Sequence, residues 1–362
     1  MTSPSPHLHR APEEVDADDL ALLAREDHWP RPTGWRLSPR AVVTYLLGGE
    51  VGGRTIHPKY LGARRRVELA VATLATDRAL LLTGAPGTAK SRLSAHLAAA
   101  ISGTSREVVQ GSAATTEEQL RYGWNYAQLL AQGPRLEALV KSPILRAMEA
   151  GTQVRLEELT RCPVEVQDAL LPVLSEKALS IPELALHIPA ARGFNLIATA
   201  NAHDRGVHAL SSALRRRFNV VELPLPDSLE LEVAIVSQRL RELADPLELP
   251  APPPAESLVR QVVQVFQELR RGRSLDGSRS FGPPSATLST AELIALFTDA
   301  MALAGHFGAR KVEAEHLAGA LRSAVVGDAS RDAEAWEAYV ENVLAQRGGE
   351  WAALHDACRA AS

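Results

Sequence analysis

The chain is poor in cysteine and in aromatic residues. Its 362 residues include 2 cysteines, Cys162 and Cys358, too few for a disulfide framework or a cysteine-based zinc site. Tryptophan, tyrosine and phenylalanine together make up 4% of the chain, so alanine, leucine and valine have to fill its core. This composition favours helical packing over an aromatic-rich β-barrel. Two isolated thiols suit a reducing compartment, and we therefore expect a cytoplasmic protein.

The chain also lacks a basic excess and a long apolar run. Its net charge of −4 makes nucleic acid an unexpected obligatory partner, because binding the phosphate backbone needs clustered positive charge. No stretch reaches the roughly 18 consecutive apolar residues of a membrane span, so none is expected. The first residues lack the apolar centre of a signal peptide. The content of 46% apolar and 23% charged residues is typical of a soluble globular protein.

The length and the order of patterns predict two domains. Residues 1–40, which begin with many Pro, Asp and Glu residues, are expected to form a flexible tail and the segment leading into the core. In residues 41–226 short apolar runs alternate with helical patterns, which predicts a doubly wound α/β domain with a mostly parallel sheet. Residues 227–362 carry helical patterns alone, one of them opening with a capping box at Ser289 and Glu292.

A glycine-rich turn joins a predicted strand to a predicted helix in the stretch "LLLTGAPGTAKSRLSAHLAAA". Strand, turn and helix in this order form a phosphate-binding loop, in which backbone N–H groups and the helix dipole attract phosphate. We expect Lys90 to neutralise phosphate oxygens and Ser91 to hold Mg²⁺ through its hydroxyl. Ala89 stands where the common motif has glycine, and a backbone with negative φ would accept it. The expected nucleotide contacts are Gly84, Ala85, Pro86, Gly87, Thr88, Ala89, Lys90 and Ser91.

Three later segments supply candidate catalytic side chains. A strand in "VRLEEL" ends at Glu157 and Glu158, which we expect to orient Mg²⁺ through water and to polarise the attacking water, respectively. Asn201 follows the strand in "GFNLIATAN" and could bond the γ-phosphate or the water, although such an asparagine is also a common turn residue. In "ALRRRF", Arg217 first and Arg216 second are candidates for an arginine finger; a favourable contact with the helix dipole is the simpler alternative.

Taken in order, "GAPGTAKS", "VRLEELTRCPVEVQDALLPVLSEK", "GFNLIATANAHDRG" and "LSSALRRRF" resemble an AAA+ ATPase of the MoxR type, over about residues 40–345. The resemblance implies an α/β nucleotide domain with a helical lid, assembly into a ring that is usually a hexamer, and hydrolysis of ATP with Mg²⁺. It assigns Lys90 and Ser91 to Walker A, Glu157 and Glu158 to Walker B, and Asn201 to sensor 1. Arg217 matches the family's finger.

The resemblance extends to partners and leaves one position unmatched. MoxR proteins are described as chaperone-like and often work with proteins that carry a von Willebrand factor A domain, so a protein client is implied. The segment "KYLG", ending in Leu61 and Gly62, is where AAA+ proteins often touch adenine. The sensor 2 arginine of the lid has no counterpart near Ser285, since Arg279 precedes that point.

Two other functions stay open at this stage. A nucleotide-binding switch with little intrinsic hydrolysis is suggested by the unmatched sensor 2, by Glu157 in place of aspartate and by Arg155 within the preceding strand. The segment "ALRRRF" also looks like that of the McrB-type GTPases, which are motors of a nucleic-acid-cutting system. The net charge of −4 argues against that motor.

Overall fold

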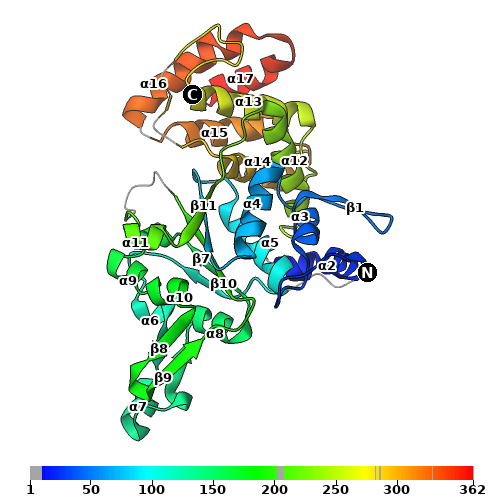
Figure 1. Ribbon diagram of the computed structural model, residues 1–362. Coiled ribbons are helices and arrows are strands. Elements are labelled where there is room, and N and C mark those ends of the chain that lie inside the picture. The colour runs from blue at the N-terminus through cyan, green and yellow to red at the C-terminus, as the bar shows by residue number, and fades with distance from the viewer. Residues whose placement is uncertain (1–9, 202–207, 282, 285–286, 328, 362) are drawn as a thin grey trace. The chain divides into compact units, whose positions relative to one another are not determined.

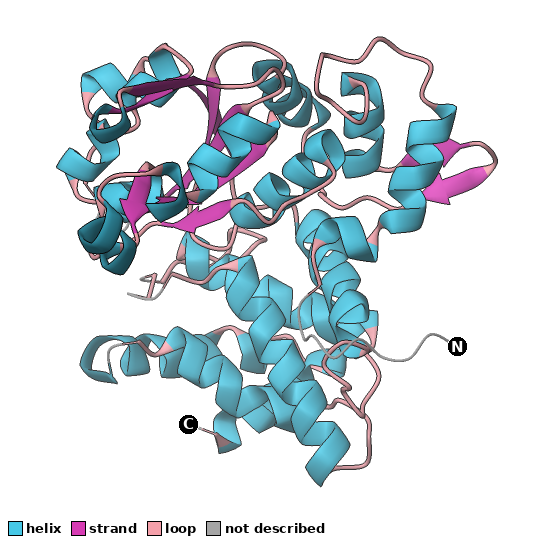
Figure 2. Cartoon of the chain, turned by 90° about the horizontal axis from the view of Figure 1, so that it is seen from below, coloured by secondary structure: helices cyan, strands magenta, loops and turns pink. Residues whose placement is uncertain are grey.

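Figure 1 shows the computed structural model of the chain, which describes residues 10–201, 208–281, 283–284, 287–327 and 329–361. The chain divides into an α/β unit of residues 10–85 and 89–223 and a helical unit, which groups Pro86–Thr88 with the residues from Pro224 onwards. This division lies close to the boundary expected at residue 226. The strands, magenta in Figure 2, belong to the α/β unit.

A five-stranded parallel sheet lies at the centre of the α/β unit. Its order is β11-β3-β10-β7-β4, so consecutive strands are joined by crossovers. Side chains alternate between the two faces, as the pleat requires: Leu81 packs into the core on one face, and Leu80 and Leu82 into the core on the other. The five apolar runs predicted to be strands are β3 (Ala79–Thr83), β4 (Val108–Gln110), β7 (Gln153–Glu157), β10 (Asn195–Ala200) and β11 (Phe218–Glu222).

Helices cover both faces of this sheet (Figure 1). Leu93 and Leu97, which recur at helical spacing after the phosphate loop, are buried. One face carries α3 (Pro39–Leu47), α4 (Arg64–Leu74) and α5 (Lys90–Ser102). The other carries α8 (Pro143–Ala150), α9 (Val164–Asp168), α10 (Leu171–Ser175) and α11 (Ser212–Arg215).

Three antiparallel hairpins accompany the sheet. The segment "KALSIPELALHIP" pairs β8 (Ala178–Ile181) with β9 (Leu186–Pro189). The segment before α8 has a helical pattern interrupted by glycines in its sequence, but within it β5 (Tyr122–Trp124) pairs with β6 (Leu139–Lys141), because Tyr122 and Leu139 are buried in the core from opposite strands. The remaining elements are β1 (Gly49–Val51), β2 (Arg54–Ile56), α6 (Glu117–Leu120), α7 (Tyr126–Gln132) and the 3₁₀ turns Leu136–Ala138, Leu159–Arg161 and Pro182–Leu184.

The expected flexible tail is wrong for most of its length. Residues 1–9 lie outside the described part, but α1 (Pro12–Val15) and α2 (Ala17–Glu26) follow directly. Leu22 and Leu23 of α2 are buried, and Lys59 forms ion pairs with Asp16 at 2.7 Å and Asp19 at 2.9 Å. The acidic residues that suggested a solvated tail therefore anchor two helices to the α/β unit.

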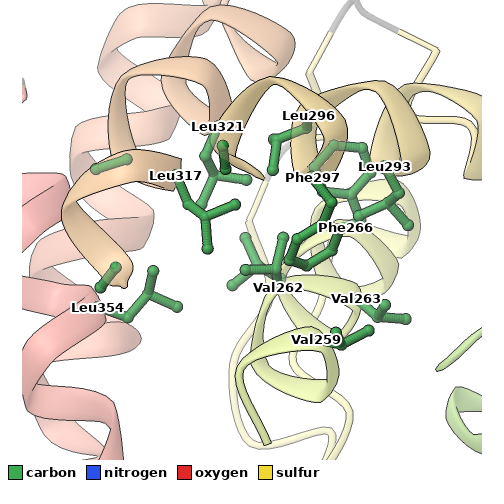
Figure 3. Packing of buried hydrophobic residues seen from close by; sticks show 14 of the residues in the cluster. Val259, Val262, Val263, Phe266, Leu293, Leu296, Phe297, Leu317, Leu321 and Leu354 are labelled. Carbon is green, nitrogen blue, oxygen red and sulfur yellow. The ribbon is translucent and has the colours of Figure 1, made fainter. Parts of the chain in front are cut away.

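The helical unit has an apolar core of its own. Phe266 and Val262 of α13 lie next to Phe297 and Leu293 of α14, and Leu317 lies close by (Figure 3). The capping box predicted at Ser289 is present, because its backbone N–H donates to Glu292 Oε2 at 2.5 Å. The helices are α12 (Leu229–Ala244), α13 (Glu256–Arg271), α14 (Thr290–Phe307), α15 (Ala314–Val325), α16 (Ala329–Asn342) and α17 (Ala352–Ala360), with 3₁₀ turns at Leu344–Gln346 and Gly349–Trp351.

Candidate nucleotide site

The candidate site lies at the carboxyl edge of the parallel sheet. Thr83, Glu157 and Ala200 are the last residues of β3, β7 and β10, which are neighbours in the sheet. Because the strands are parallel and paired without large offsets, the residues that follow them meet at one edge. The loop after Thr83, the two glutamates and Asn201 are thereby brought together from distant parts of the sequence.

The loop between β3 and α5 has the backbone of an anion-binding turn. Gly87 has φ of 76°, a conformation that glycine adopts without strain, and α5 begins at Lys90. The ammonium group of Lys90 is held across the turn, donating to Gly84 O at 3.0 Å and Ala85 O at 2.8 Å. The helix N-terminus and this lysine give the turn the positive field that a phosphate requires.

Ala89 departs from the expectation for its backbone. Its φ is 63° with ψ of 25°, which is left-handed, whereas a negative φ was expected. The turn needs a residue of this handedness just before α5 so that the chain can enter the helix. Alanine meets the requirement at a cost, because its Cβ approaches the carbonyl oxygen that glycine would leave clear.

Glu157 is buried and is bonded by four side chains. Its Oε2 accepts from the hydroxyls of Ser91 and Thr199, each at 2.7 Å. Its Oε1 accepts from Ser94 Oγ at 2.5 Å and from Arg155 Nη2 at 2.8 Å. The arginine that looked out of place in a buried strand is thus the counter-charge of Glu157. A buried carboxylate bonded to a hydroxyl of the phosphate loop is a donor set that suits Mg²⁺ held partly through water.

The environment of Glu157 favours its ionised form. Burial by itself would raise the pKa of this carboxyl group. The hydrogen bonds from Ser94, Ser91 and Thr199 and the charge of Arg155 outweigh burial, so the pKa is lowered. Glu157 therefore carries its negative charge beside the phosphate loop before any nucleotide or metal is present.

Glu158 and Asn201 face each other across the edge of the sheet. Asn201 Nδ2 donates to both carboxylate oxygens of Glu158 at 3.1 Å, and Arg161 Nε donates to Oε2 at 3.2 Å. The backbone of Glu158 is left-handed with φ of 58°, and its N–H donates to Thr199 Oγ1 at 3.0 Å. This strained turn directs Glu158 away from Glu157 and towards Asn201.

The two finger candidates differ in their surroundings. Arg217 is half-buried and donates from Nη1 to Ala213 O at 2.7 Å, and from Nε to Ser175 Oγ. The side chain of Arg216 is exposed, and its carbonyl oxygen accepts from Arg78. The order expected from the sequence, Arg217 before Arg216, is therefore not favoured by exposure, since a finger must reach another subunit.

Two further predictions concern the adenine contact at Leu61 and Gly62 and the sensor 2 arginine. Arg92 of α5 donates to Lys59 O at 3.1 Å, so the segment leading to Leu61 and Gly62 lies beside the helix of the phosphate loop. The adenine contact itself stays a prediction. Ser285, the point where sensor 2 was sought, lies outside the described residues, and Arg279 is engaged within the helical unit with Gln346.

Sequence reasoning missed Ser94 and Thr199, which complete the surroundings of Glu157. Each had a positional signal. Ser94 lies three residues after Ser91 and therefore on the same face of α5. Thr199 lies two residues before Asn201 and therefore on the same face of the extended chain.

Two family models match the chain. The first, described as AAA domain (dynein-related subfamily), matches residues 79–218, and the second, YehL-like AAA+ ATPase C-terminal domain, matches residues 230–358. The protein YehL of Escherichia coli (strain K12) is 39% identical over 364 residues, which cover 99% of each chain. The chain belongs to the YehL-like AAA+ ATPases. The expected AAA+ fold, an α/β P-loop domain followed by a helical domain, is confirmed by this membership, while the MoxR type stays a prediction.

More distant matches cover parts of this YehL-like chain. A protein of Staphylococcus haemolyticus (strain JCSC1435) is 27% identical over 195 residues, 54% of this chain and 69% of that protein. Among solved structures, NtrX from Brucella abortus in complex with ADP is similar at 16% identity and a TM-score of 0.46, over 71% of this chain. The match spans about half of the NtrX chain, 54%. Within the described residues, no helix combines the length and the apolarity needed to cross a membrane.

Proposed function

We propose that this YehL-like protein binds ATP with Mg²⁺ and hydrolyses it to ADP and phosphate, at a site completed by a second copy of the chain. One observation carries the proposal. Lys90, Glu157, Glu158 and Asn201 converge on one edge of the sheet, each bonded in a manner that suits its expected role. Family membership supplies the ATPase class, and the residue roles below are part of the proposal.

The phosphate loop and Lys90 would receive the triphosphate. The contacts of Lys90 with Gly84 O and Ala85 O place its ammonium group over the turn, where it can exchange these carbonyls for phosphate oxygens. Ser91 and Glu157 would hold Mg²⁺, the latter through water. When bound, Mg²⁺ offsets the negative charge of the phosphates and of the leaving ADP.

Glu158 would orient the attacking water and accept its proton. Asn201, which already contacts both oxygens of Glu158, would keep the carboxylate turned towards the γ-phosphate. The oxygen–phosphorus bond to the γ-phosphoryl group breaks as the water oxygen bonds to phosphorus, and ADP leaves. An arginine of the neighbouring subunit, Arg216 or Arg217, would stabilise the charge that spreads over the transferred group.

The wider role rests on the resemblance to MoxR proteins. It supports a ring, usually of six copies, that uses the hydrolysis cycle to remodel or mature a partner protein, including one with a von Willebrand factor A domain. The exposed side chain of Arg216, directly after α11, is consistent with a site shared between subunits. Neither the ring nor the partner is needed for the ATPase test that follows.

The decisive measurement is ATP turnover with Mg²⁺ at increasing protein concentration, for the wild type and for Glu158→Gln. We expect wild-type specific activity to rise with concentration. The variant should bind ATP but turn it over at least about 100-fold more slowly than the wild type. Glu149→Gln is the matched control, because Glu149 pairs with Lys141 on an exposed surface outside the site. Equal turnover by the wild type and Glu158→Gln at every concentration contradicts the proposal.

A nucleotide switch is the second candidate, and one observation favours it. In this conformation both oxygens of Glu158 accept hydrogen bonds from Asn201, and Oε2 also accepts one from Arg161. A carboxylate engaged in this way is not poised to take a proton from water until these contacts loosen. Tight ATP binding with turnover no faster than that of Glu158→Gln would identify the switch.

A further inference from the structure

Arg155 is the middle residue of β7, which lies between β10 and β4 in the parallel sheet. A charged side chain is unusual at such a position. Its side chain is 13% exposed, and the side chain of its partner Glu157 is 5% exposed. Burying a charged guanidinium costs free energy unless its hydrogen bonds and its counter-ion make up for the lost water. A leucine or valine would serve the strand better, so the arginine calls for a reason other than packing.

The guanidinium group is fixed by more than its ion pair. Arg155 Nε donates to Ser94 Oγ at 3.0 Å, and Nη1 donates to Ser105 O at 3.0 Å. Nη2 donates to Glu157 Oε1 at 2.8 Å. Nη2 also donates to the backbone oxygen of Ser91 at 3.5 Å. Three of these four contacts therefore do not involve Glu157, and they hold the positive charge in place whatever that carboxylate does.

Glu157 in turn has donors on both oxygens. Ser91 and Thr199 donate to Oε2, and Ser94 and Arg155 donate to Oε1. Ser91 belongs to the phosphate loop itself, so this carboxylate lies directly beside the place where a triphosphate would bind. Without a counter-charge, Glu157 would repel the nucleotide, and a metal ion would have to screen the two from each other.

We propose that Arg155 supplies part of the charge compensation that the metal ion normally supplies, so that ATP binding to this site depends only weakly on Mg²⁺. This inference rests on the proposed function, since it concerns the same nucleotide site. Arg155 is a positioning residue in this account, because it acts on the nucleotide through Glu157. Mg²⁺ remains necessary for the hydrolysis step.

The test measures the dissociation constant of a fluorescent methylanthraniloyl derivative of ATP on the full chain, with Mg²⁺ and with EDTA. For the wild type we expect the two constants to agree within about threefold. For Arg155→Met we expect binding in EDTA to weaken by about tenfold, since a close opposite charge commonly shifts such equilibria by one or more factors of ten. Binding of Arg155→Met in Mg²⁺ should change little, because the metal restores the compensation.

Three further variants make the result specific. In Glu157→Gln the carboxylate has no charge to compensate, so adding Arg155→Met should no longer weaken binding in EDTA. Arg155→Lys keeps the charge and should stay close to the wild type. Arg146→Met removes an arginine that pairs with Glu107 at 2.9 Å on the surface, and it should leave both constants unchanged. Urea unfolding of each variant identifies any that fails to fold.

The outcomes separate the inference from the proposed function. If the wild type binds the probe and Arg155→Met binds it equally well in EDTA, the inference is overturned and the ATPase proposal stands. The inference is also overturned if Arg155→Met weakens binding equally with and without Mg²⁺, or weakens it in the Glu157→Gln background too, because Arg155 would then act on binding independently of Glu157. A wild type that binds no nucleotide under either condition overturns both.

Discussion

The left-handed backbone at Ala89 predicts that one kind of substitution has opposite effects at two nearby positions. Its φ of 63° costs alanine about 1–2 kcal/mol relative to a right-handed conformation, whereas glycine adopts it freely. Replacing Ala89 by glycine removes that cost. It also makes the unfolded chain more flexible, which lowers the free energy of unfolding by about 0.4–1 kcal/mol. Ala89→Gly is therefore expected to raise the free energy of unfolding by about 0.5–1 kcal/mol.

Ala95→Gly is the matched control, because it makes the same chemical change inside α5 (Lys90–Ser102). There the backbone is helical, and glycine is expected to lower the free energy of unfolding by about 1 kcal/mol. Urea-induced unfolding of the full chain, followed by circular dichroism, gives the midpoints of both variants and of the wild type. If Ala89→Gly lowers the midpoint as Ala95→Gly does, the argument from the left-handed turn is refuted.

Three other predictions concern buried charge and the shared site. Glu232 is fully buried in the helical unit and pairs with Arg270 at 3.0 Å, so Glu232→Ala should destabilise the chain by about 3–5 kcal/mol, measured by urea unfolding. The lowered pKa of Glu157 stabilises the fold fully above its ordinary value of 4.5, and this contribution is lost as pH falls through the lowered value. The stability difference between wild type and Glu157→Gln should therefore stay constant from neutral pH down to about pH 4.5 and shrink below it. Mixing Glu158→Gln with an excess of Arg216→Ala or Arg217→Ala tests the finger. Glu158→Gln alone and the variant that lacks the finger are expected to be inactive, and turnover in their mixture would show that the site takes residues from two chains.

The sequence predicted much of the fold and of the site, but not the details of contact. The strand before the phosphate loop was recognisable from its apolar run, and the glutamates and Asn201 from their places after two other strands. Ser94 was not recognised, because the partner of a small polar residue on a helix face cannot be inferred until the strand that packs against the helix is known. The acidic start of the chain was misjudged, because the partner of Asp16 and Asp19 is Lys59, which lies some forty positions away and becomes close only in the folded chain.

By itself, the sequence determined the five strands of the parallel sheet, and the order in which the phosphate loop, the glutamates and the asparagine occur. These features depend on local patterns and on the rule that parallel strands end at one edge of the sheet. Only the tertiary structure decided that Arg155, Ser94 and Thr199 surround Glu157, and that Ala89 is left-handed. Such contacts depend on the register of β7 against β10 and on how α5 packs over the sheet, and both are set by the whole core rather than by any one segment.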